Sequence, residues 1–212
     1  MKLTVFGASG GIGGEVVRQA LDAGHTVTAV VRDAARFEAR HARLTVCTVA
    51  GLSDPGPLRP ALEGSDAALS GIGPRRRRDA GVASAATRAI LAALADCGVR
   101  RFVAVSAAPV GAIPEGESWP MRRVAYPLIR AVLRDIYADL AVMEEEIRDS
   151  PTDWTVVRPP RLLDKPLTGG YRTAIGTNVP RAGSISRADV AHAMLAVLDD
   201  PATIRQAVGV AR

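Results

Sequence analysis

Three glycines near the N-terminus, Gly7, Gly10 and Gly13, follow an apolar run and precede a helical pattern. Their G-x-x-G-x-x-G spacing is typical of a loop that binds the pyrophosphate of a dinucleotide. The first glycine allows a tight turn, the second lets the backbone approach the phosphates, and the third lets the helix pack against the strand. A helix that begins here also offers free N–H groups to an anion. The alternative is a flexible turn, because turns use glycine for its conformational freedom alone.

The expected phosphate loop is followed, at the end of the next apolar run, by Arg32, with Asp33 beside it and Arg36 nearby. A guanidinium at this place suits the 2′-phosphate of NADPH, because it forms paired charge-assisted hydrogen bonds. In the alternative, Arg32 is a surface residue and the Asp33 carboxylate binds the ribose, which would select NAD. The sequence favours NADPH (NADP). The loop residues expected to contact it are Gly7, Ala8, Ser9, Gly10, Gly11, Ile12 and Gly13.

Apolar, β-branched runs alternate with helical patterns along most of the chain. They predict strands at 3–8, 26–32, 44–50, 66–73, 101–107 and 153–159. Helices are predicted at 11–23, 58–62, 80–96 and 121–149, and Pro127 is expected to kink the last helix or to mark its true start. Such alternation predicts an α/β class, with a Rossmann-like, doubly wound, mostly parallel sheet of about seven strands.

The amino-acid composition changes after Pro159, where proline, glycine and threonine become frequent. Two short strand-like pieces lie at 171–176 and 207–212, and a helix between them begins after Ser186. Ser186 as N-cap, with Asp189 as the third helical residue, resembles a capping box. We expect a single NAD(P)-binding domain over residues 1–212: a cofactor-binding core at 1–159 and a small substrate-side segment at 160–212.

Composition excludes several classes of function. The net charge is +5, but aromatic residues make up 4% of the chain, which is too few for nucleic-acid stacking platforms. No apolar run approaches a membrane span, and the N-terminus lacks the parts of a signal peptide, so a cytoplasmic protein is expected. The three histidines are scattered and neither cysteine has a ligand-like neighbour, so no metal site is expected. The expected partner is a small molecule, and the expected state is a monomer or homodimer.

Several stretches together carry a family resemblance: the glycine spacing, "VVRD", "VAVSA", "DWTVVRPP" and "ISRADVA". With them the chain resembles atypical short-chain dehydrogenases/reductases of the NmrA-like kind over essentially its whole length. Within these, "RPPRLLDKPLTGGY" (158–171) resembles the biliverdin-IXβ reductase/flavin reductase group. The resemblance implies NADPH-dependent hydride transfer to a conjugated acceptor such as a flavin, quinone or tetrapyrrole. It also permits an alternative, a non-catalytic NADP(H)-binding redox sensor.

The catalytic dyad of the larger family, Tyr-x-x-x-Lys, is absent, because no lysine lies between Lys2 and Lys165. Tyr126 and Arg130 have the spacing of the dyad, with arginine in place of lysine. In the alternative interpretation, Tyr126 is an aromatic core residue with no catalytic role. Ser106 keeps the hydroxyl that the resemblance places after the fifth strand. Arg161 stands where the reductase group has a histidine, and it can bind an anionic substrate or stabilise an oxyanion. The candidate catalytic residues are therefore Ser106, Arg161 and Tyr126.

Loops after the later strands complete the expected cofactor site. Leu52 stands where the family commonly has an aspartate near the adenine. The further cofactor-contacting candidates are Leu52, Ser53, Gly73, Pro74, Arg75, Ser106, Pro159 and Pro160. The run Arg75–Arg78 is either a basic rim that attracts an anionic ligand or a solvated charge run. The acidic stretch 143–146 is expected to be a solvated helix face.

Overall fold

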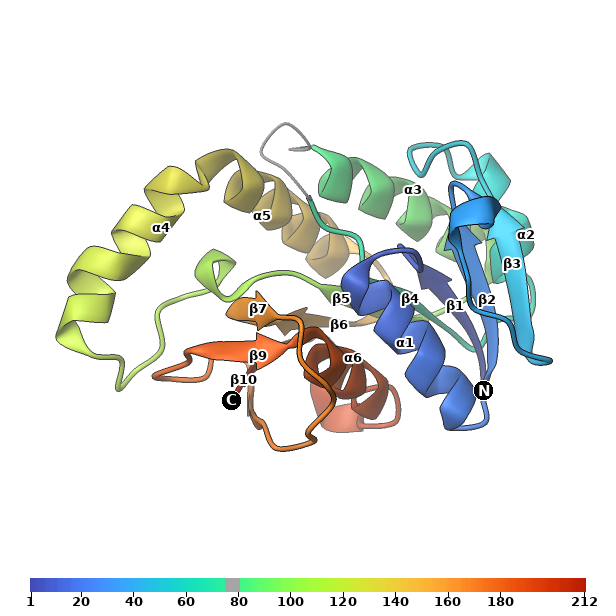
Figure 1. Cartoon of the computed structure of the whole chain (residues 1–212). Coiled ribbons are helices and arrows are strands. Elements are labelled where there is room, and N and C mark those ends of the chain that lie inside the picture. Colours follow the sequence, from blue (N-terminus) through green and yellow to red (C-terminus); the bar gives the residue numbers. More distant parts are fainter. Residues whose placement is uncertain (75–80) are drawn as a thin grey trace.

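The computed structural model describes residues 1–74 and 81–212 and has an eight-stranded sheet at its centre (Figure 1). The sheet order is β3-β2-β1-β4-β5-β6-β10-β8, in which β8 pairs antiparallel with β10 and every other described pair is parallel. The strands are β1 (Lys2–Phe6), β2 (Thr26–Val31), β3 (Leu44–Thr48), β4 (Ala67–Ser70), β5 (Arg101–Val105), β6 (Asp153–Arg158), β8 (Arg172–Ile175) and β10 (Gln206–Ala211). The run 3-2-1-4-5-6 is the Rossmann order, which confirms the predicted fold class.

The strand count departs from the expected seven or so. Besides the eight strands of the main sheet, β7 (Arg161–Leu163) and β9 (Ser184–Ser186) pair as a separate parallel ribbon. Both are three residues long and lie far apart in the chain, so neither carries enough period-two pattern to be predicted. The ribbon belongs to the segment that follows Pro159.

Helices cover both faces of the main sheet (Figure 1). On one face lie α1 (Gly11–Asp22) and α6 (Arg187–Ala196), and on the other lie α2 (Arg59–Leu62), α3 (Val82–Cys97) and α5 (Arg134–Asp149). Alternation along β1 supplies both cores: Val5 packs with α1 and α6, whereas Phe6 packs with α3 and α5. No helix in the described ranges has both the length and the apolar composition to cross a membrane.

The long helix predicted at 121–149 is divided into parts. A π-helical turn, η5 (Met121–Ala125), leads into α4 (Tyr126–Val132), which has Pro127 in its first turn, where proline is tolerated. The expectation that Pro127 marks a start is thus confirmed for α4. The break before α5 falls instead at Leu133, whose φ of −113° and ψ of 30° leave the helical region. In Figure 1, α4 extends away from the main sheet.

The expectation for the acidic stretch 143–146 was wrong at Glu144. This residue is 4% exposed and forms an ion pair with Arg158 at the end of β6, where Arg158 Nε donates to Glu144 Oε1 over 3.0 Å. A buried carboxylate needs such a partner, because desolvation disfavours an unpaired charge. The pair ties α5 to the edge of the sheet that carries the strands' carboxyl ends.

Ser186 is confirmed as the N-cap of α6. Ser186 Oγ accepts a hydrogen bond from the Asp189 N–H over 2.9 Å and donates to Asp189 Oδ2 over 2.7 Å. Asp189 Oδ1 also accepts from the N–H groups of Thr168 and Gly169. Burial would raise the pKa of Asp189, but these hydrogen bonds outweigh it and hold the pKa below its usual value. The "PLTG" stretch is therefore fastened to α6 through one ionised carboxylate.

Candidate functional site

A cleft of about 320 Å³ lies beyond the carboxyl ends of β1, β2 and β4, where a doubly wound sheet binds its ligands. Strand order reverses between β1 and β4, so the loops that leave these strands diverge and open the cleft. It is lined by Gly7, Ser9, Gly10, Val30, Val31, Arg32, Ala50, Gly51, Leu52, Gly71, Ile72, Gly73 and Val82.

Two glycines of the loop between β1 and α1 are required by close backbone contact. Gly7 has a φ of +72°, and its carbonyl oxygen accepts the Gly10 N–H over 2.8 Å, which closes the turn. A β carbon on Gly13 would overlap that oxygen and stand 2.7 Å from the Gly7 carbonyl carbon. The first glycine therefore makes the turn, and the third allows α1 to approach β1.

Gly10 differs from both, because its open side faces the cleft. Its φ of −90° and ψ of 166° suit any residue, and a β carbon would meet one atom within 4 Å, the Gly7 oxygen at 3.1 Å. Gly10 is also the N-cap of α1, which has no acidic residue in its first turn and no side-chain cap from residues 1–74 or 81–212. Open N–H groups and a close backbone approach at one wall of a cleft fit a pyrophosphate.

The end of β2 places a cationic side chain, Arg32, at the cleft. Arg32 lines it and forms no hydrogen bond or ion pair with the residues that the structure describes. Asp33, the competing candidate, is engaged elsewhere: Oδ1 accepts the Ala35 N–H over 3.0 Å, and Oδ2 lies 3.3 Å from Arg36 Nε. The geometry favours the guanidinium over the carboxylate as the group that meets a ribose or its phosphate.

The predicted cofactor residues divide between the cleft wall and its surroundings. Gly7, Ser9, Gly10, Arg32, Leu52 and Gly73 line the cleft, whereas Ala8, Gly11, Ile12, Gly13, Ser53, Pro74, Ser106, Pro159 and Pro160 do not. Arg75, with the rest of the run 75–78, lies outside the described residues. Sequence reasoning missed the wall residues Val30, Val31, Ala50, Gly51, Gly71, Ile72 and Val82. All of them except Val82, the first residue of α3, lie at or directly after the ends of predicted strands, and that position was their signal.

Ser106 follows β5 and is 8% exposed. Its N–H donates to the Val157 carbonyl over 2.8 Å, but its hydroxyl oxygen has no hydrogen-bond partner among the described residues. Buried hydroxyls are normally paired, so an unpaired one calls for an explanation. A polar group of a ligand would satisfy it.

Tyr126 is buried at the start of α4 and is not activated as an acid. Burial, followed by the nearby Glu117 carboxylate, raises its pKa, and Arg130 only partly opposes this. The Arg130 guanidinium lies 6.0 Å from the Tyr126 ring centroid and donates instead to the carbonyls of Pro109 and Gly111. These contacts favour the aromatic core alternative for Tyr126 over the catalytic one.

Arg161 begins β7 and is exposed. It makes no hydrogen bond or ion pair within residues 1–74 and 81–212, so its charge is available to a ligand. Cys47 and Cys97 are both free thiols. In the same ranges, no three His, Cys, Asp or Glu side chains gather closely enough to hold a metal ion.

Comparison with known proteins agrees with this geometry. A family of NAD(P)H-binding domains matches residues 7–201, so the chain belongs to that family. Its fold is that of an atypical short-chain dehydrogenase/reductase, as the sequence resemblance implied.

Solved structures resemble the chain along its whole length. A proposed NADH-flavin reductase from Streptococcus pneumoniae is 24% identical, with a TM-score of 0.81 and coverage of 100% of this chain and 99% of that one. A short-chain dehydrogenase/reductase from Veillonella parvula, in complex with NADP, is 21% identical, with a TM-score of 0.81 and coverage of 100% and 94%. ChuY, an anaerobillin reductase from Escherichia coli O157:H7, is 22% identical, with a TM-score of 0.78 and coverage of 100% and 97%.

Proposed function

We propose that this protein is an NADPH-dependent reductase that transfers a hydride to a conjugated small-molecule acceptor. The observation that carries the proposal is the cleft wall in which the start of α1 and the guanidinium of Arg32 occur together, neither of them paired with a side chain in the part of the chain that the structure describes. The first suits a pyrophosphate and the second suits a 2′-phosphate. The similarity to ChuY and to the pneumococcal protein supports the acceptor class.

Apolar side chains of the same wall would hold the adenine. Val30, Leu52 and Ile72 line the cleft beside Arg32, so a flat base can lie on apolar surface while the guanidinium meets the phosphate. Leu52 offers no hydrogen-bond acceptor where the family commonly has an aspartate. Adenine binding would therefore depend on contact area more than on base-edge hydrogen bonds.

The nicotinamide ring supplies a hydride when the cofactor is bound. The residues of this chain would hold and orient the reactants: the Ser106 hydroxyl would pair with a polar group of cofactor or substrate, and Arg161 would attract an anionic substituent. Tyr126 keeps its proton, because its pKa is raised. Without an activated acid, an acceptor that spreads negative charge over a conjugated system suits this site better than an isolated carbonyl.

The test is steady-state oxidation of NADPH, and of NADH in parallel, against flavins, quinones, tetrapyrroles and simple aldehydes. We expect turnover of one conjugated class, with NADPH preferred, and none of the aldehydes. Ser106→Ala should reduce kcat, whereas the control variant Ser118→Ala, at an exposed serine, should leave kcat unchanged. Aldehyde turnover equal to that of the conjugated acceptors would contradict the proposal.

A second candidate is a non-catalytic NADP(H)-binding redox sensor. It is favoured by the contacts of Arg130, which bind carbonyl groups instead of activating Tyr126. Tight NADPH binding with no turnover of any acceptor in the same experiment would support the sensor over the reductase.

A further inference from the structure

Arg187, the first residue of α6, lies across the first residue of α1. A β carbon on Gly11 would stand 2.6 Å from Arg187 Cδ and 3.0 Å from Nε, so the arginine stem lies directly against the Gly11 backbone. Gly11 follows Gly10, which lines the cleft. The absence of a side chain at position 11 therefore admits a cation to the rim of the phosphate loop.

The backbone that carries Arg187 is held in place from both sides. Gln19 on α1 donates through Nε2 to the Ala188 carbonyl over 2.9 Å. On the other side, the Ser186 N-cap and its two hydrogen bonds with Asp189 fix the first turn of α6. Arg187 thus has a fixed backbone and a side chain that is 31% exposed.

The ion pair between Arg187 and Asp164 is exposed and therefore weak. Arg187 Nη1 donates to Asp164 Oδ1 over 2.5 Å, and the Asp164 side chain is 89% exposed. An ion pair with so exposed a carboxylate contributes little, because water competes for both charges. Within the described residues Asp164 is the one hydrogen-bond partner of Arg187, which leaves most of the five guanidinium donors unused.

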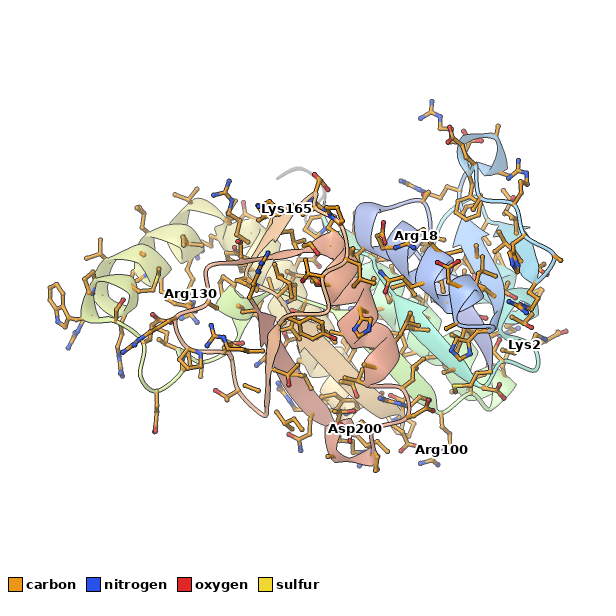
Figure 2. The ribbon with its side chains drawn as sticks, turned by 60° about the horizontal axis from the view of Figure 1, so that its bottom comes forward. Lys2, Arg18, Arg100, Arg130, Lys165 and Asp200 are labelled. Carbon is orange, nitrogen blue, oxygen red and sulfur yellow. The ribbon has the colours of Figure 1, made fainter. Side chains whose placement is uncertain are left out.

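We propose that Arg187 is an additional cofactor-binding residue, which exchanges Asp164 for the pyrophosphate held at the glycine loop. This inference rests on the proposed NADPH site. Arg187 belongs to the "ISRADVA" motif in the substrate-side segment, so the inference gives this motif a role in ligand binding. The guanidinium would contact the pyrophosphate from the side opposite the backbone N–H groups of α1. A guanidinium binds phosphate through paired charge-assisted hydrogen bonds, which are stronger than its bond to a solvated carboxylate. Figure 2 shows Lys165, the residue after Asp164, on the loop that runs beside α6. Because the Asp164 side chain is already 89% exposed, the released carboxylate can turn to solvent.

The test measures dissociation constants by calorimetry for NADPH and for adenosine 2′-monophosphate, which retains the adenine and 2′-phosphate but lacks the pyrophosphate. Arg187→Ala should weaken NADPH about tenfold or more and should change adenosine 2′-monophosphate by less than about twofold. Arg187→Lys should retain part of the NADPH affinity. Arg18→Ala is the control, because Arg18 forms exposed ion pairs on α1, the helix whose first residue Arg187 contacts.

Asp164→Asn separates ligand binding from a structural latch. If Asp164 competes with phosphate, its removal should leave NADPH binding unchanged or tighten it; if the pair only holds α6 in place, both Asp164→Asn and Arg187→Ala should weaken both ligands alike and lower the melting temperature. The latter result would overturn the inference, as would full NADPH affinity in Arg187→Ala. Failure of the wild-type protein to bind NADPH would instead refute the proposed function.

Discussion

The helices α1 and α3 begin at the same edge of the main sheet, but they differ in whether a side chain caps the N–H groups of the first turn. The start of α3 is closed: Asp139, 6% exposed on α5, accepts the N–H groups of Ala83 and Ser84 and the Ser84 hydroxyl. The first turn of α1 contains no acidic residue, and no side chain of the described residues caps it. Both helices follow neighbouring parallel strands, β1 and β4, so topology alone does not explain the difference.

The difference shows where the protein stabilises its fold and where it leaves donors for a ligand. N–H groups at a helix start need partners, and a buried carboxylate supplies them permanently at α3. At α1 the same donors face a cleft that also contains Arg32. We therefore expect changes at α3 to affect stability, and changes at the open start of α1 to affect cofactor binding.

The largest effect should come from Gly13→Ala, which places a methyl group against the Gly7 carbonyl. We expect a loss of about 3 kcal/mol in the free energy of unfolding, measured by urea denaturation, because the backbone cannot yield easily. The matched variant Gly10→Ala should cost far less, since its β carbon meets only the Gly7 oxygen at 3.1 Å within 4 Å. Equal losses would show that Gly10 is also a packing glycine.

Asp139→Ala should come next. It removes the acceptor for three donors at the start of α3 and should lower the free energy of unfolding by about 2 kcal/mol. The control is Glu145→Ala, an exposed acidic residue on the same helix, α5. If both variants unfold at the same urea concentration, Asp139 does not stabilise α3 as a cap.

Arg32→Glu should weaken NADPH about tenfold more than it weakens NADH, because only NADPH carries the 2′-phosphate. Fluorescence titration with both cofactors would measure this. Arg36→Glu serves as the control, since Arg36 is exposed and contacts Asp33. Equal weakening of NADPH and NADH by Arg32→Glu would remove Arg32 from the 2′-phosphate site.

The smallest effect concerns Asp189 and depends on pH. Its pKa is lowered in the folded protein, so its stabilising contribution is present above the unfolded value, about 3.9, and is lost as the pH falls through the folded value. Asp189→Asn should therefore be about 1 kcal/mol less stable than wild type at pH 7. Thermal melts should show this gap narrowing below about pH 4; a gap independent of pH would contradict an ionised Asp189.

The sheet and the phosphate loop could be predicted because their signals are local. Apolar runs gave the positions of β1, β2, β3, β4, β5 and β6, and glycine spacing identified the turn between β1 and α1. The π-turn at 121–125 and the break at Leu133 were not foreseen, because helical periodicity continues through both.

Long-range contacts could not be predicted from the sequence in the same way. Glu144 looks like one more exposed acid until Arg158 is brought to it from β6. Arg187 acquires its place at the phosphate loop only because α6 packs against α1, and no spacing in the sequence records that contact. The cleft residues that were not predicted are small or apolar, and such residue types do not by themselves indicate a binding site.

The most direct test of the account is calorimetric titration of NADPH into wild-type protein and into Gly10→Val. The conformation of Gly10 accepts a valine, and the added side chain would project into the cleft where the pyrophosphate is proposed to bind. We predict a loss of about 100-fold or more in NADPH affinity, with the melting temperature of the free protein nearly unchanged. Unchanged NADPH affinity in a folded Gly10→Val protein would contradict the proposal that the open start of α1 holds the cofactor.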